Sequence, residues 1–100
     1  MKRVSFPEFI QRCSTLKIAV SITRTASYEH FRTLGNKLSF DRVNTKKSWQ
    51  IDLHQLYDAY QQLDIITPTI LKRVMSGRIY SPAWAVLVDA GFYNRYGHKI

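Results

Sequence analysis

The sequence predicts a single α+β domain over residues 1–100, built on an antiparallel meander sheet of three or four strands. An N-terminal helix and three C-terminal helices are expected to pack on one face of that sheet. Alternating polar and apolar residues flank a Gly35-Asn36 dipeptide, which is typical of a β-hairpin turn. Thr-Pro and Ser-Pro dipeptides in the second half are typical helix starts. The 45% hydrophobic and 13% aromatic content indicates a folded globule.

The first expected elements are a helix and a strand. Ser5 and Glu8 form a capping-box pattern ahead of apolar residues at helical spacing, so a helix is expected over 6–15. Cys13 lies on its apolar stripe and is expected to be a small buried hydrophobe. Alternation over 17–23 predicts a half-buried strand. The side chains of that strand expected to face the core are Ile18, Val20 and Ile22.

The Gly35-Asn36 turn fixes the expected register of a hairpin over 29–42. Counting back from the turn brings Phe31 opposite Phe40 on one face. The other expected pairs are Leu34–Lys37, Thr33–Leu38, His30–Asp41 and Glu29–Arg42. The alternative for residues 28–31 is a short helix.

Two further loops complete the expected meander. A turn at 24–27 would place Val20 opposite Phe31, and a loop at 44–47 would place Phe40 opposite Ile51. The same two loops would also pair Ile22 with Glu29 and Arg42 with Trp49. With this register one face is apolar and the other polar, as expected of an antiparallel sheet with one solvated side.

Three helices are expected in the second half. Asp52 with Gln55 is a second capping-box pattern, before an apolar stripe over 53–63. Thr67 and Ser81 each precede a proline and are expected to be N-caps. The two helices that follow are expected to end at Gly77 and Gly91. The last one, over 82–90, is apolar nearly all round and is expected to be the most buried.

The charge of +8 is distributed unevenly. Residues 1–50 carry ten Lys and Arg against three Asp and Glu, whereas residues 51–100 carry five against four. A basic half suggests nucleic acid or another anionic partner. The loops at 24–27 and 44–47 share one end of a meander, so cations and aromatics are expected to gather there, as phosphate contacts and base stacking require. The residues expected at this site are Arg24, Tyr28, Arg42, Lys46, Lys47 and Trp49.

Three functions are therefore considered. The first is a non-enzymatic module that binds DNA, RNA or another polyanion through the basic hairpin end. The alternative is a homodimeric interaction module with incidental charge, which would associate through an edge strand or through Tyr93 and Tyr96. The third is a small toxin-like ribonuclease that uses His30, Asp41 and Arg32.

Other classes of function are disfavoured. Cys13 is the only cysteine, so no internal disulfide or cysteine cluster for zinc can form. No cofactor is expected, because no phosphate loop, nucleophile elbow or metal-ligand spacing is present. No apolar run has membrane-spanning length and the start lacks the pattern of a signal peptide, so a cytoplasmic location is expected. A helix-turn-helix motif that includes Lys72 and Arg73 is disfavoured, because the helix after them is too apolar to contact bases in the major groove of DNA.

One resemblance adds to these expectations. The stretch 38–49, Leu-Ser-Phe-Asp-Arg-Val-Asn-Thr-Lys-Lys-Ser-Trp, together with Tyr80-Ser81-Pro82-Ala83, resembles small orphan proteins of bacterial mobile elements, such as those of integron gene cassettes. The resemblance implies a bacterial, cytosolic protein, and it implies no particular site residue.

Overall fold

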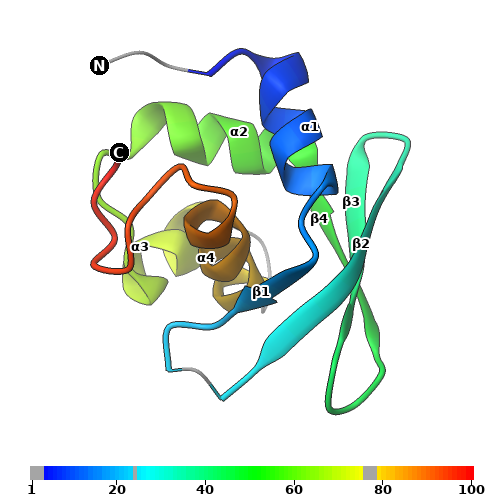
Figure 1. Ribbon diagram of the computed structural model, residues 1–100. Helices are drawn as coiled ribbons and strands as arrows, with labels where there is room; N and C mark the ends of the chain where they lie inside the picture. Colours follow the sequence, from blue (N-terminus) through cyan, green and yellow to red (C-terminus); the bar gives the residue numbers. More distant parts are fainter. Residues whose placement is uncertain (1–3, 24, 76–78) are drawn as a thin grey trace.

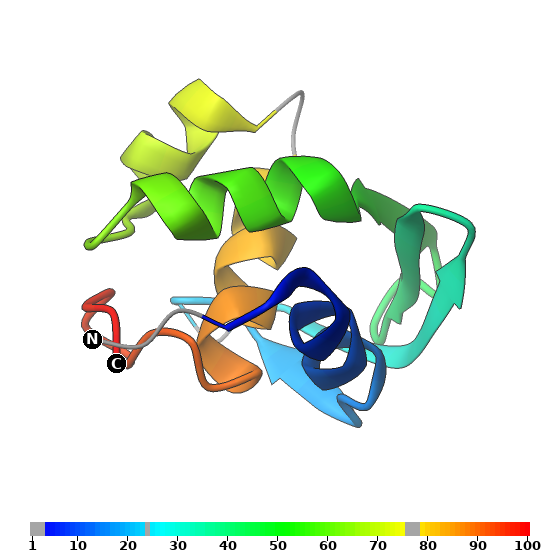
Figure 2. The ribbon, with the colours of Figure 1, turned by 90° about the horizontal axis from the view of Figure 1, so that it is seen from above.

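The computed structural model describes residues 4–23, 25–75 and 79–100, and it confirms the predicted α+β class (Figure 1). The four strands form one antiparallel sheet in the order β1-β2-β3-β4. The elements in chain order are α1 (Phe6–Ser14), β1 (Ile18–Val20), β2 (Ser27–Leu34), β3 (Lys37–Arg42), β4 (Ser48–Asp52), α2 (Leu53–Gln62), α3 (Pro68–Val74) and α4 (Tyr80–Asp89). The helices gather on one side of the sheet, and the β3–β4 hairpin extends away from them (Figures 1 and 2).

Side-chain caps start three of the helices as predicted. Ser5 Oγ accepts a hydrogen bond from the N–H of Glu8 (3.5 Å) at the start of α1. Asp52 and Thr67 accept equivalent bonds at the starts of α2 and α3, each 3.1 Å long. These caps were predictable because they depend on residues only three positions apart.

The start of α4 was predicted wrongly. This helix begins at Tyr80, its N-cap is Ile79, and Ser81 lies in the first turn instead of capping it. The first four N–H groups of a helix have no intrahelical partner, so Pro82 is accommodated at the third helical position as well as at the first. The expected end at Gly77 lies outside the described residues.

Helix α4 is the most buried helix, as predicted. The segment Ala83–Leu87 has no residue more than 1% exposed. The helix ends before Gly91, whose φ of 89° suits a glycine. Cys13 packs in the same core, and burial raises the pKa of its thiol to about 12. The thiol therefore stays protonated and acts as a small apolar group.

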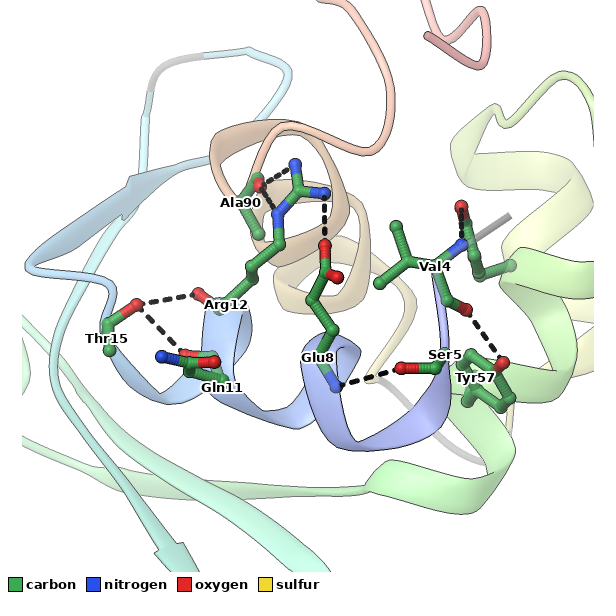
Figure 3. A network of polar contacts seen from close by, with 9 residues as sticks. Val4, Ser5, Glu8, Gln11, Arg12, Thr15, Tyr57 and Ala90 are labelled. Atoms are coloured by element: carbon green, nitrogen blue, oxygen red, sulfur yellow. Dashed lines mark hydrogen bonds and ion pairs between the residues drawn. The ribbon is translucent and has the colours of Figure 1, made fainter. Parts of the chain in front are cut away.

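Arg12 joins the first helix to the last (Figure 3). Its Nε and Nη2 donate to the carbonyl oxygen of Ala90, at 3.2 and 2.9 Å, and its guanidinium lies 4.2 Å from the centre of the Phe92 ring. A cation at the C-terminus of α4 is favourable, because the last carbonyls there carry partial negative charge.

The β2–β3 hairpin keeps the predicted register only near its turn. Leu34 pairs with Lys37 and Phe31 stacks on Phe40, but a bulge follows between Glu29 and Arg32. Beyond the bulge the actual pairs are Glu29–Asp41 and Tyr28–Arg42, so the predicted Glu29–Arg42 pair is wrong. The bulge has a reason in packing: with one extra residue, His30 at φ 58°, both Tyr28 and Phe31 face the core. We call this core-facing side the inner face.

Strand β1 has the opposite orientation to the one predicted. Ala19 and Ser21 are buried, whereas Ile18 is 52% exposed. Helix α4 packs directly against this strand, and small side chains allow that close approach. The loop has the predicted length but begins two residues earlier, so Ile18 pairs with Glu29 and the predicted pairing of Val20 with Phe31 is wrong.

Strand β4 is shifted by two residues from the prediction. Phe40 lies opposite Trp49 instead of Ile51, and Ile51 lies opposite Leu38. The connecting loop is 43–46, and the N–H of Arg42 donates to the carbonyl oxygen of Lys47 (2.8 Å). A shift of two residues keeps each side chain on its predicted face, because strand side chains alternate with a period of two.

Residues near both ends of the described chain are hydrogen-bonded to α2. Tyr60 Oη accepts a hydrogen bond from the N–H of Val4 (3.2 Å), and Tyr57 Oη donates to the carbonyl oxygen of Val4 (2.8 Å). Near the other end, Lys99 Nζ donates to the carbonyl oxygen of Tyr60 (2.6 Å) and lies 4.7 Å from the centre of its ring.

Candidate functional site

Three predicted cations lie together where β3 turns into β4, and with Trp49 they form what we call the basic end. The N–H of Arg42 donates to the carbonyl oxygen of Lys47, one position beyond the last ladder pair, Asp41–Ser48. Alternation from Phe40 and Trp49 then places Arg42 and Lys47 on the inner face. Like charges directly across a ladder are unfavourable unless an anion lies between them. Lys46 lies in the loop at φ 58°, and its Nζ is 3.7 Å from Glu29 Oε2.

Trp49 lies next to Arg42 and Lys47 on the inner face. It is opposite Phe40 and therefore diagonal to Arg42 on the inner face, although the sequence predicted it directly opposite Arg42. Its ring is half-buried. Trp49 Nε1 and Arg42 Nε are both shielded from solvent and have no hydrogen-bond acceptor among the described residues. Both are therefore unsatisfied donors that neighbouring protein atoms cover.

Two residues predicted for this site stand apart from it. Tyr28 is only 4% exposed and its ring packs edge-on against Phe40, with centroids 5.4 Å apart. Its ring is therefore not available for stacking on a base. Arg24 lies outside the described residues, so its place beside Lys46 and Lys47 stays a prediction.

A second polar cluster lies at the bulge, on the outer face of the sheet. His30 Nδ1 is 3.1 Å from Asp41 Oδ2, and Arg32 Nη2 is 3.5 Å from Asp41 Oδ1. Ser48 Oγ donates to Asp41 Oδ1 (2.8 Å), a partner that the predicted register did not reveal. The His30 side chain is 65% exposed. The structure thus brings together the three residues considered for ribonuclease chemistry.

Hydrogen bonds keep Asp41 ionised. Those from Ser48 and then His30 lower the pKa of the Asp41 carboxyl below its ordinary value of 3.8, and the charge of Arg32 acts in the same direction.

We expect the interactions of Asp41 to stabilise the fold at neutral pH and to lose their effect in acid. The folded-state pKa is below the unfolded value, so the contribution is complete above pH 4 and is lost as the pH falls through the folded pKa. Urea midpoints of the original protein and of Asp41→Asn, measured from pH 7 to pH 2, should therefore differ at neutral pH and converge in acid. A difference that stays constant down to pH 2 would contradict this assignment.

The surfaces considered for self-association are partly covered. The open edge of β1 is bound by α4 and the tail, because Asp89 Oδ2 accepts from the N–H of Val20 (2.7 Å) and Arg95 donates to the carbonyl oxygens of Val20 and Ser21. Tyr93 is buried. The exposed candidates that remain are the β4 edge and Tyr96, which is 85% exposed. The dimer stays a prediction.

Two further features bear on the class of site. Within residues 4–23, 25–75 and 79–100, no group of three His, Cys, Asp or Glu side chains is placed to hold a metal ion. In the same ranges, no helix combines the length and the apolar character needed to cross a lipid bilayer.

Comparison with known proteins leaves the chain without a recognised relative. The resemblance to proteins of integron gene cassettes therefore stays a prediction, as does the expected nucleic-acid partner. No protein-family model matches this chain, and no curated protein and no solved structure matches it either.

Proposed function

We propose that the protein binds nucleic acid, or another polyanion, through the basic end of the β3–β4 hairpin and does so without catalysis. One observation carries the proposal: Arg42 and Lys47 are adjacent at the end of the ladder, joined by one backbone hydrogen bond, and neither has a carboxylate within ion-pair distance among the described residues. A phosphate between them would turn a repulsive pair into two charge-assisted contacts.

The basic end also stands clear of the helices. Elsewhere in the described chain, some cations are ion-paired, as Arg95 is with Asp89 and Lys99 is with Asp64. The hairpin end projects away from the helices, so an extended anion can reach it without displacing them (Figure 1).

The test is a salt series rather than a single affinity. Binding of a fluorescein-labelled mixture of DNA and RNA, followed by anisotropy, should weaken steeply with salt. Lys47→Gln should lower the slope of log K against log salt by about 1, since one phosphate contact is lost. Lys37→Gln is the matched control, because Lys37 is an exposed lysine at the opposite end of the same hairpin.

The double variant Lys46→Glu with Lys47→Glu should abolish binding and leave the circular dichroism spectrum unchanged, because both side chains are exposed. Unchanged retention of this variant on a heparin column would overturn the proposal. An equal loss of slope in Lys37→Gln and Lys47→Gln would show that net charge, and not the basic end, is responsible.

A second candidate function is ribonuclease activity, which the cluster at the bulge favours. Asp41 fixes the His30 ring through Nδ1, and Arg32 supplies a cation beside it, as an acid–base group near a phosphate requires. RNA cleavage that is lost in His30→Ala would support this function. Cleavage that survives the substitution would exclude His30 as its site.

A further inference from the structure

An aromatic row crosses the inner face and ends at Trp49, next to Arg42 and Lys47. Phe31 stacks on Phe40 with ring centroids 5.2 Å apart and an interplanar angle of 28°, and Phe40 lies opposite Trp49. Phe40 is fully buried, whereas Phe31 and Trp49 are half-buried. Phe31 and Trp49, at the two ends of the row, therefore keep part of their apolar surface in contact with solvent.

Hydrogen-bond donors lie beside this apolar surface. Arg42 Nε and Trp49 Nε1 are shielded from solvent and have no acceptor among the described residues, although a buried donor usually has one. Both belong to the inner face, as does Lys47 next to Arg42. A phosphate arriving from solvent would instead meet the exposed Lys47 ammonium group and the half-buried Arg42 guanidinium, because Arg42 Nε and Trp49 Nε1 are themselves covered.

The position of Trp49 distinguishes between two forms of nucleic acid. Trp49 belongs to strand β4 and not to the loop 43–46 at the hairpin tip. It lies on the same face as Arg42 and Lys47. A duplex that touches the tip offers phosphates and groove edges, but its bases stay stacked inside. An unpaired strand can lay a base against an indole while its phosphates follow the cations, which is the usual arrangement in proteins that bind single strands.

We infer that the polyanion is a single-stranded nucleic acid, with one base stacked on Trp49 and the adjoining phosphate held between Arg42 and Lys47. This inference rests on the proposed function. It names the substrate class and adds Trp49 as the residue that distinguishes single strands from duplexes.

Intrinsic fluorescence gives a direct test, because the chain has two tryptophans and Trp84 is only 1% exposed. The unmodified protein is titrated with an oligothymidylate of about 12 nucleotides, with a duplex of the same length and with heparin. The single strand should quench part of the emission, and the duplex and heparin should not. The single strand should also bind about tenfold more tightly than the duplex, as one stacked base implies.

Trp49→Leu then separates stacking from charge. It should weaken single-strand binding about tenfold and leave duplex binding unchanged, whereas Tyr96→Leu, which alters an exposed aromatic in the tail, should change neither. Equal affinities for both forms, with no quenching and with the salt slope still reduced by Lys47→Gln, would overturn this inference and leave the proposed function intact. No salt-dependent binding of any of the three ligands would overturn both.

Discussion

Replacing Gly97 with alanine is expected to destabilise the protein by about 3 kcal/mol or more. Two causes act together at this position. Gly97 has a φ of 84°, which a residue with a Cβ rarely adopts, and an added Cβ would lie only 2.0 Å from the carbonyl oxygen of Ile66. The obstacle is backbone that is itself held in place, because the N–H of Ile66 donates to the carbonyl oxygen of Gly97 (2.7 Å). The C-terminal segment must therefore move away from Ile66.

Gly35→Ala is the matched control for this prediction. Gly35 also has a positive φ, 61°, but nothing lies within 4 Å of an added Cβ. It should lose only the conformational cost, about 1 kcal/mol. Urea denaturation of both variants measures the difference, and equal losses would show that crowding against Ile66 is unimportant.

The second large effect is expected at Tyr60, whose replacement by alanine should cost about 3–5 kcal/mol. Its ring lies 5.5 Å from the Phe9 ring, 5.0 Å from the Phe92 ring and 4.7 Å from Lys99 Nζ. Removing the ring leaves a cavity between α1, α2 and the tail, and it removes one of the two aromatic rings beside Lys99 Nζ.

The same deletion at Tyr96 gives the control, because that side chain is 85% exposed and should contribute less than about 0.5 kcal/mol. Tyr60→Phe should lie in between, since it removes only the hydroxyl that accepts from the N–H of Val4, worth about 1 kcal/mol. Thermal or urea unfolding orders the three variants. A Tyr60→Ala loss as small as that of Tyr96→Ala would contradict the packing argument.

The parts of the fold that the sequence predicted correctly depend on local chemistry. The caps at Ser5, Asp52 and Thr67 need residues three positions apart, and the turn at Gly35 needs one positive φ. The burial of α4 follows from its apolar composition alone. Each of these features is decided within a few residues, so a single sequence reveals it.

The errors arose where packing between distant elements decides the outcome. Alternation over 17–23 is compatible with either face, and the close approach of α4 selects Ala19 and Ser21 over the larger Ile18. The bulge at His30 is equally invisible, because nothing local requires Tyr28 and Phe31 to share a face.

The sequence predicted which cations meet at the candidate site more accurately than it predicted the strand pairing around them. Lys46, Lys47 and Arg42 do meet at one hairpin end, since a short loop guarantees it. The shift of β4, however, moved Trp49 from a position opposite Arg42 to the diagonal one, and the bulge at His30 placed Tyr28 in the core. Strand pairing beyond the first loop depends on tertiary contacts, which the loop sequence does not contain.

Residues 4 and 99 are both hydrogen-bonded to Tyr60, and this affects local unfolding at the two ends of the chain. In most small domains the extremities fray independently and at little cost. Here the peptide N–H of Val4 and the ammonium group of Lys99 share Tyr60 as their partner, and both extremities lie beside α2 (Figure 1). If either end of the chain detaches, Tyr60 loses one of its two partners and holds the other end less firmly. Amide exchange rates at the two ends should therefore change together.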